Sequence, residues 1–150
     1  MKIGTVSVET GRRVSGRFET GDYRCSVRAA IPFIAVRGAE DGPTITVLAC
    51  QHGRELNGIE GIRRAVGRID PGALRGTAVF IPCANPVAAR TRRQDFPYES
   101  GRFFRSAVSF NLNRVWPGKA DGSIYEQMAH AMWEGAIARS QACIDLHGWT

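Results

Sequence analysis

A continuous run of apolar and β-branched residues at positions 44–50 constrains the fold of this chain more than any other segment. A strand without a polar face must be buried on both sides, as the strands of parallel sheets are. Apolar residues then recur at helical spacing across positions 59–69, and a second apolar run covers positions 76–82. Strand, helix and strand with short links form a βαβ unit with a parallel strand pair. The sequence therefore predicts an α/β fold in which helices flank a mixed, largely parallel sheet.

The rest of the chain divides around this unit. Residues 1–40 are predicted to form a β-rich lead-in, and residues 41–150 a βαβ core. The short strands of the lead-in, separated by glycine-containing turns, are expected at positions 5–8, 14–18, 23–27 and 31–36. Within the core, residues 84–118 show no period and are expected to form a long loop. A helix is predicted over 123–140, where Ser123 and Glu126 have the spacing of a capping box, followed by a third buried strand at 141–146.

Composition and net charge limit the classes of partner and the cellular location that we expect for this protein. The 150 residues suit one domain, and the net charge of +6 comes almost entirely from arginine. The arginines do not form a basic run with interleaved aromatics, so we expect an anionic small-molecule substrate or a solvated basic surface and no nucleic acid. No apolar segment suits a signal peptide or a membrane helix, so we expect no membrane association and a cytoplasmic protein. The four cysteines have no CxxC spacing and are expected to be reduced and buried: Cys25, Cys50, Cys83 and Cys143.

Three side chains suggest a metal site. His52 and Glu55 follow the first buried strand, and His147 directly follows the strand at 141–146. Ligands of open α/β sheets bind beyond the carboxyl ends of the strands, so both histidines are expected at one edge of the sheet. Two imidazoles and a carboxylate are a ligand set of catalytic zinc, which keeps a further position open for water. A single histidine is more often structural, and His130, within the predicted helix, is interpreted in that way.

A polar segment in the long loop suggests a substrate contact. Asn113 and Arg114 lie side by side, and an arginine can bind a carboxylate through two parallel hydrogen bonds. The alternative is a polar turn before Trp116 and Pro117. Both interpretations remain open on the residues alone.

Four segments together resemble the succinylglutamate desuccinylase/aspartoacylase family, a branch of the zinc carboxypeptidase-like hydrolases. They are Gly42-Pro43-Thr44 leading into His52-Gly53-Arg54-Glu55, then Asn85-Pro86-Val87-Ala88, then Asn111-Leu112-Asn113-Arg114 with Trp116-Pro117-Gly118, and finally Ile144-Asp145-Leu146-His147. The resemblance spans residues 42–148 and rests on the order and spacing of the segments. It implies a phosphorylase/hydrolase-like sheet and hydrolysis of an acyl group from an N-acyl amino acid or a similar carboxylate-bearing amide or ester.

The resemblance also implies residue roles. One zinc ion would be held by His52, Glu55 and His147, and a substrate carboxylate by Asn113 and Arg114. An arginine among residues 90–93 would polarise the scissile carbonyl; Arg92 is preferred over Arg93, although the register is ambiguous by one or two residues. Asn111 stands where the family usually has aspartate, which removes a charge and keeps a hydrogen-bonding side chain.

The family's general-base glutamate has no counterpart here. Glu99 and Glu126 are present, but neither occupies a matching position. We therefore expect a truncated, N-terminal part of such an enzyme. Three alternatives remain: an inactive metal-binding fragment that needs a missing half or a partner, a carboxypeptidase-like peptidase, and a basic nucleic-acid-binding module with structural histidines. A sheet that ends at the strand at 141–146 would expose an apolar edge, so we also expect self-association through this edge.

Overall fold

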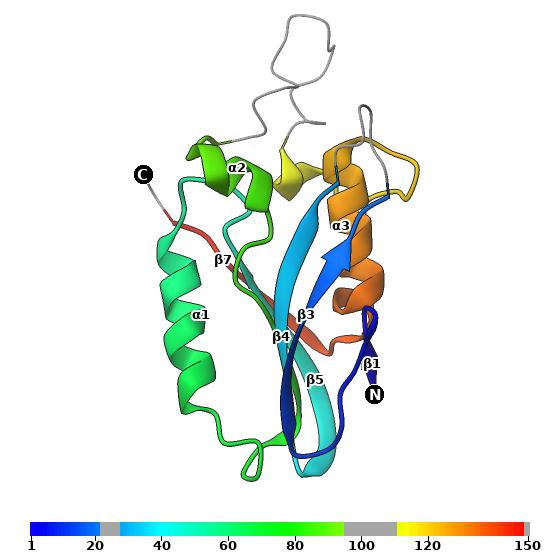
Figure 1. Cartoon of the computed structure of the whole chain (residues 1–150), viewed down its shortest axis with the longest axis vertical. Coiled ribbons are helices and arrows are strands. Elements are labelled where there is room, and N and C mark those ends of the chain that lie inside the picture. Colours follow the sequence, from blue (N-terminus) through cyan, green and yellow to red (C-terminus); the bar gives the residue numbers. More distant parts are fainter. Residues whose placement is uncertain (22–27, 95–110, 149–150) are drawn as a thin grey trace, which may run out of the picture.

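The computed structural model describes residues 1–21, 28–94 and 111–148 (Figure 1). In chain order its elements are β1 (Lys2–Ile3), β2 (Val6–Ser7), β3 (Arg12–Glu19), β4 (Ala30–Arg37), β5 (Glu40–Ala49), α1 (Asn57–Arg68), β6 (Arg75–Ile81), α2 (Pro86–Thr91), the 3-10 helix η2 (Leu112–Arg114), α3 (Ile124–Gly135), the 3-10 helix η3 (Ile137–Arg139) and β7 (Ala142–Leu146). β1 and β2 pair with each other in a small antiparallel ribbon.

The other strands form one five-stranded mixed sheet in the order β3-β4-β6-β5-β7. β5 runs parallel to both of its neighbours, while β4 is antiparallel to β3 and to β6. The chain passes from β5 to β6 on one side and later returns to β7 on the other side. The carboxyl end of β5 is therefore a topological switch point, the place where open α/β sheets bind their ligands.

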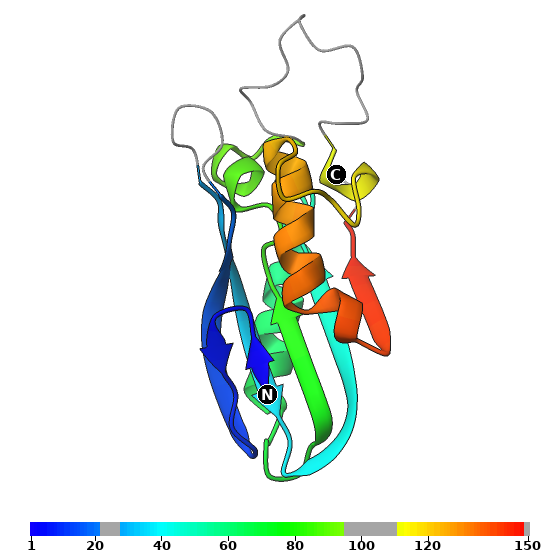
Figure 2. The same cartoon turned by 90° about the vertical axis from the view of Figure 1, so that its right-hand side faces the viewer.

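Helices cover the two faces of this sheet and create two hydrophobic cores. Figure 1 shows α1 on one face and α3 on the opposite face, and Figure 2 shows the same layers from the side. The amphipathic helix α1 buries Ile62 and Val66 against Val36, Ala78 and Phe80. α3 covers the larger core, whose fully buried members include Ile31, Phe33, Ile81, Leu112, Tyr125, Met128 and Met132. The inner strands are thus buried on both faces, as their continuous apolar sequence predicts.

The predicted α/β fold with a mixed sheet and flanking helices is confirmed. The three elements of the βαβ unit, β5, α1 and β6, lie where the sequence pattern predicts them. The predicted strands at 14–18 and 31–36 lie within β3 and β4. The predicted strand at 23–27 falls outside the described residues. β3 and β4 are part of the main sheet, so the N-terminal lead-in joins the same sheet as the core. Ser123 caps α3 in a full capping box with Glu126, as predicted.

Three expectations about the second half of the chain are wrong. The strand predicted as buried at 141–146 is β7, an exposed edge strand, because within the described residues it pairs only with β5. Cys143 on β7 is consequently exposed and Cys83 is half-buried, while Cys50 is buried as expected; all three are free thiols. Cys25, the fourth cysteine, lies outside the described residues. The helix predicted over 123–140 ends at Gly135, where a side chain would meet the ring of Phe18, and only η3 continues it.

None of the helices in these described ranges has the length and apolar character needed to cross a membrane.

Candidate metal centre

His52 and Glu55 lie in the loop that connects β5 to α1, at the carboxyl end of the central strand. Cys50, the first residue after β5, has a φ of 58° and turns the chain out of the strand direction. The backbone N–H of Glu55 donates to the carbonyl of His52 over 3.1 Å. This tight turn brings the two side chains together, with Glu55 Oε1 2.9 Å from His52 Nδ1. The local backbone therefore preassembles two of the three candidate ligands.

His147 reaches the same place from the neighbouring strand. It directly follows β7, and the parallel register pairs Ala49 of β5 with Leu146 of β7. The segments that follow β5 and β7 therefore leave the sheet side by side. Glu55 Oε2 lies 2.8 Å from His147 Nδ1, and the two imidazole centroids are 5.2 Å apart. The structure thus brings together the three side chains that the sequence suggests as ligands, with one potential ligand atom from each residue within 4.8 Å of the others.

An oxygen acceptor also holds the outer nitrogen of each imidazole ring. His52 Nε2 lies 3.1 Å from Asn111 Oδ1, and His147 Nε2 lies 2.8 Å from Asp145 Oδ2. Asn111 Oδ1 also accepts from the backbone N–H of Asn113 over 2.9 Å, which identifies this atom as the oxygen. Such outer acceptors fix the tautomer and the orientation of metal-binding histidines. The replacement of the family's aspartate by Asn111 therefore retains an acceptor for His52.

This tautomer makes the centre fit a cation. When Nε2 carries the ring proton, the Nδ1 lone pair of each histidine faces an oxygen of Glu55. Lone pairs and a carboxylate at 2.8–2.9 Å repel one another unless a cation or a shared proton lies among them. Two imidazole nitrogens and one carboxylate are a donor set of catalytic zinc. The residues present therefore fit a divalent metal ion.

The same convergence shifts the ionisation of two members. When protons rather than a cation lie between Glu55 and the two imidazoles, burial acts to raise the pKa of Glu55, but hydrogen bonds from His52, the backbone of Gly148 and His147 hold this pKa below its ordinary value. Burial acts to lower the pKa of His147, but the charge and hydrogen bond of Asp145, with those of Glu55, raise it above its ordinary value. The centre thus favours an ionised carboxylate beside positive charge.

The other predicted site residues, Asn113, Arg114 and Arg92, differ in how exposed their side chains are. Asn113, in η2, is half-buried and lines the cavity described below. Arg114 is exposed, and its Nη1 donates to the carbonyl of Asn113 over 3.0 Å. Arg92 is exposed at the C-cap of α2, with a φ of 50°, and its carbonyl accepts from Arg54 Nε over 3.2 Å. The assignment of Asn113, Arg114 and Arg92 to the substrate therefore stays a prediction.

Two glycines near the candidate ligands pack against protein. A β-carbon on Gly53 would lie 2.2 Å from the backbone of Ala88 in α2, and one on Gly58 would lie 2.7 Å from the β-carbon of Ala49. Both glycines therefore have a structural role, because a side chain at either position would collide with neighbouring protein atoms. Gly53 allows the His52 loop to pack directly on α2.

The segment predicted as a long loop at 84–118 contains the helix α2 and the short 3-10 helix η2, neither of which was predicted. Asn85 caps α2: its Oδ1 accepts from the backbone N–H of Ala88 over 3.0 Å. Its Nδ2 donates to the carbonyl of Gln51 over 3.1 Å, and the side chain is completely buried. Pro86 at the first helical position agrees with the preference of helices for proline there. The Asn85-Pro86 pair was the available signal for this helix.

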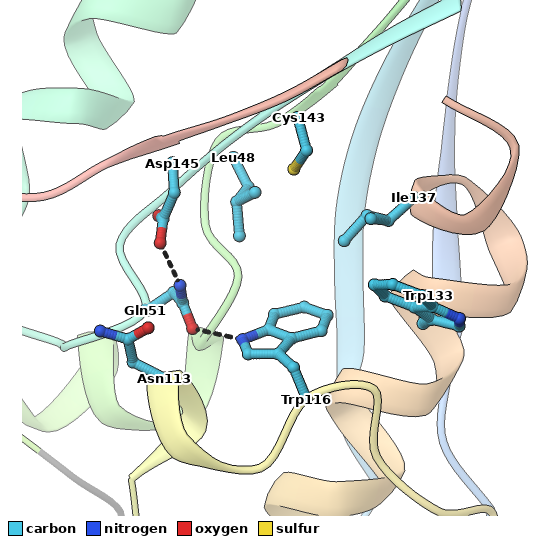
Figure 3. Close-up of a pocket in the computed structure, with 8 residues that line it drawn as sticks. All are labelled: Leu48, Gln51, Asn113, Trp116, Trp133, Ile137, Cys143 and Asp145. Atoms are coloured by element: carbon cyan, nitrogen blue, oxygen red, sulfur yellow. Dashed lines mark hydrogen bonds between the residues drawn. The ribbon is translucent and has the colours of Figure 1, made fainter. Parts of the chain in front are cut away.

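A cavity of about 210 Å³ adjoins the centre on the α3 face of the sheet. As Figure 3 shows, its apolar wall comes from Leu48, Trp116, Trp133, Ile137 and Cys143, and its polar end from Gln51, Asn113 and Asp145. Sequence analysis did not single out Gln51 or Asp145. The position of Asp145 could have been predicted, because residues two apart along a strand point to the same face and Asp145 is two residues before His147. No feature of the sequence indicated a role for Gln51.

Comparison with known proteins agrees with this fold and centre. Residues 41–150 match the succinylglutamate desuccinylase/aspartoacylase catalytic domain. The chain is 30% identical over 117 residues to the N-alpha-acetyl-L-2,4-diaminobutyric acid deacetylase of Halomonas elongata, an alignment that covers 78% of this chain and 31% of the deacetylase.

Solved structures show the same fold. An aspartoacylase family protein from Mesorhizobium loti superposes with a TM-score of 0.76 at 25% identity, over 95% of this chain and 42% of that protein. The product-bound ectoine utilization protein EutE (DoeB) from Ruegeria pomeroyi superposes with a TM-score of 0.73 at 21% identity, over 95% of this chain and 42% of that protein. The chain thus spans less than half the length of these relatives.

The chain belongs to the succinylglutamate desuccinylase/aspartoacylase family. Members of this family are hydrolases that include a deacetylase of an acetylated amino acid.

Proposed function

We propose that this chain carries the metal-binding part of a zinc-dependent hydrolase that removes an acyl group from an N-acyl amino acid or a similar carboxylate-bearing amide or ester. The observation that carries the proposal is the convergence of His52, Glu55 and His147 at the switch point of the sheet. The deacetylase relative supports the substrate class, because its name describes removal of an acetyl group from an amino acid.

Different residues of this chain would bind the metal ion, orient its ligands and bind the substrate. His52, Glu55 and His147 hold the ion, while Asn111 and Asp145 orient the two imidazoles. A zinc ion bound there supplies a Lewis acid and lowers the pKa of coordinated water toward ~7. The half-buried Asn113 and the exposed Arg114 would offer donors to a substrate carboxylate, the role that the family resemblance implies for them. Arg92, at the end of α2, supplies positive charge for the scissile carbonyl.

The proton acceptor of the reaction is not assigned to this chain. Glu126 closes the capping box of α3 through Ser123, so it serves the helix end rather than the metal centre. Glu99 lies outside the described residues. Glu55 is engaged by both histidines. Glu126 and Glu55 are therefore both engaged in other contacts.

A second candidate function follows from the length of the chain. It spans 31% of the deacetylase and 42% of the Mesorhizobium loti structure. The alternative is a metal-binding fragment that turns over substrate only with a further segment or a partner chain. Both candidate functions require the same metal centre, but in the alternative the chain alone does not hydrolyse substrate.

Hydrolysis of N-acetyl-diaminobutyrate, N-succinylglutamate and N-acetylaspartate by the zinc-loaded chain separates the two functions. The hydrolase proposal expects turnover of at least one substrate, lost in His52→Ala and in Glu55→Ala and retained in His130→Ala. His130 is the matched control, because it is a half-buried histidine within α3 and away from the centre. Stoichiometric zinc without turnover of any substrate would support the fragment alternative.

A further inference from the structure

A chain of hydrogen bonds connects the wall of the cavity to the outer side of His147. The indole N–H of Trp116 donates to Gln51 Oε1 over 2.9 Å, and Gln51 Nε2 donates to Asp145 Oδ2. The same Asp145 oxygen lies 2.8 Å from His147 Nε2. Figure 3 shows the Gln51 amide between the carboxylate of Asp145 and the indole ring of Trp116.

The chemistry of the partners determines the direction of each bond. An indole nitrogen can only donate, so the atom of Gln51 that faces Trp116 must be its oxygen. The amide nitrogen must then face Asp145, whose ionised carboxylate can only accept. The orientation of the Gln51 amide is thus unique, and both of its ends are used.

Gln51 is also held at its backbone. The whole residue is buried, with a relative exposure of 2%, and its backbone carbonyl accepts a hydrogen bond from Asn85 Nδ2 over 3.1 Å. Asp145, by contrast, is on the exposed edge strand β7. A carboxylate on an exposed strand can rotate, so the rigid partner in this pair is Gln51. It restricts Asp145 to the rotamer that accepts from His147.

We propose that Gln51 is a positioning residue for the metal centre, which sets the tautomer and ring orientation of His147 through Asp145 and joins them to Trp116. This proposal rests on the proposed metal site and adds to it a residue that does not contact the ion. Because Trp116 lines the cavity, the arrangement of the cavity wall and the geometry of the metal centre are coupled through one buried amide.

Three substitutions separate the bonds of this chain. Gln51→Met keeps the length of the side chain and removes both hydrogen bonds. Gln51→Glu keeps the acceptor for Trp116 and replaces the donor to Asp145 by a second carboxylate. Trp116→Phe removes the N–H and keeps an aromatic ring. Gln127→Met is the matched control, because Gln127 is a buried glutamine of α3 whose Nε2 donates to the carbonyl of Gly122.

The affinity for Zn²⁺, measured by competition with a chromophoric chelator, and the visible spectrum of the Co²⁺-loaded chain are the readouts. Loss of an outer partner of a metal-binding histidine typically weakens metal affinity about 10- to 100-fold. Gln51 acts one bond further out, through Asp145, so the expected loss in Gln51→Met and Gln51→Glu is at the lower end of this range, about 10-fold. The loss in Trp116→Phe is expected to be smaller, and none is expected in Gln127→Met. The Co²⁺ spectrum is expected to change in both Gln51 variants, a change that a merely structural role of Gln51 would not cause.

The outcomes are distinct. Wild-type affinity and an unchanged Co²⁺ spectrum in both Gln51 variants, with zinc binding lost in His52→Ala, would overturn the positioning role and leave the metal site in place. No zinc binding by the wild-type chain would overturn both. Circular dichroism of the metal-free variants shows which are folded; if Gln51→Met is not, Gln51→Glu and Trp116→Phe decide by the same criteria.

Discussion

The carboxylate of Glu55 lies 2.8 Å from the imidazole of His147, although the two residues are 92 positions apart in the chain. This contact exists because β5 and β7 are parallel neighbours and end in register, at Ala49 and Leu146. Glu55 also contacts His52 through its other oxygen, so one carboxylate joins the two histidines. The candidate metal centre is thus a consequence of strand order, and disturbing the loops that follow β5 and β7 should disturb it first.

The first prediction concerns the contact between the His52 loop and α2. We expect Gly53→Ala to lower the free energy of unfolding by about 1–3 kcal/mol, the usual cost of overpacking, because the new methyl group would lie 2.2 Å from the backbone of Ala88. Gly61→Ala is the matched control: Gly61 is in α1 with no atom near the added β-carbon, and alanine there should stabilise by roughly 0.5–1 kcal/mol. Urea denaturation of both variants measures the two changes. Equal effects of the two substitutions would contradict the packing account.

The second prediction concerns the cap of α2. Asn85→Ala removes the acceptor for Ala88 and leaves the carbonyl of Gln51 without its side-chain donor. We expect a loss of about 2 kcal/mol or more in the free energy of unfolding, because a lost N-cap costs about 1 kcal/mol and a buried unpaired carbonyl about 1–3 kcal/mol. Asn85→Ser keeps a capping oxygen and should recover about 1 kcal/mol. A serine variant no more stable than the alanine variant would show that the cap contributes nothing.

The third prediction is a pH dependence on the surface of α1. Hydrogen bonds from Arg63 and Arg64 lower the pKa of Glu60 from 4.5 to about 2. A depressed folded-state pKa stabilises the fold above the unfolded-state value, and this contribution disappears as the pH falls from 4.5 toward 2. The difference in unfolding free energy between the wild type and Glu60→Gln should therefore favour the wild type at pH 7 and shrink below pH 4.5. Urea denaturation across this range measures the difference, and a difference independent of pH would refute the assignment.

The fourth prediction concerns the free edge of the sheet. β7 is an edge strand whose Ile144 is 48% exposed, and such edges invite pairing with another chain. We propose that the 150-residue chain self-associates through β7, and we expect Ile144→Lys to shift it toward the monomer. Size-exclusion chromatography with light scattering over a range of concentrations measures the mass. A wild-type chain that stays monomeric at high concentration would oppose the proposal.

The central sheet and the meeting of the three candidate ligands were predictable from sequence for a physical reason. The segments at 44–50 and 76–82 have no polar face, so they had to be inner strands, and parallel inner strands end at a common edge. His52 follows the inner strand β5, and His147 follows the edge strand β7, which ends at the same side of the sheet because it runs parallel to β5. Their approach therefore required no knowledge of side-chain packing.

Other features depended on contacts that leave no periodic signal. Helix α2 has six residues, fewer than two turns, so its only sequence signal was the capping pair Asn85-Pro86. The exposure of β7 depends on which strands lie beside it, which its apolar sequence does not report. Gln51 looked like an ordinary loop residue, and only the three-dimensional placement of Trp116 and Asp145 gives it two partners.

The central claim is that His52, Glu55 and His147 hold one metal ion. Elemental analysis of zinc after equilibrium dialysis tests this claim most directly, in the wild type and in single alanine variants of the three residues, with His130→Ala as the control. We expect about one zinc ion per chain in the wild type and the control and almost none in the three variants. Sub-stoichiometric zinc in the wild type, or zinc retained in the three variants, would contradict it.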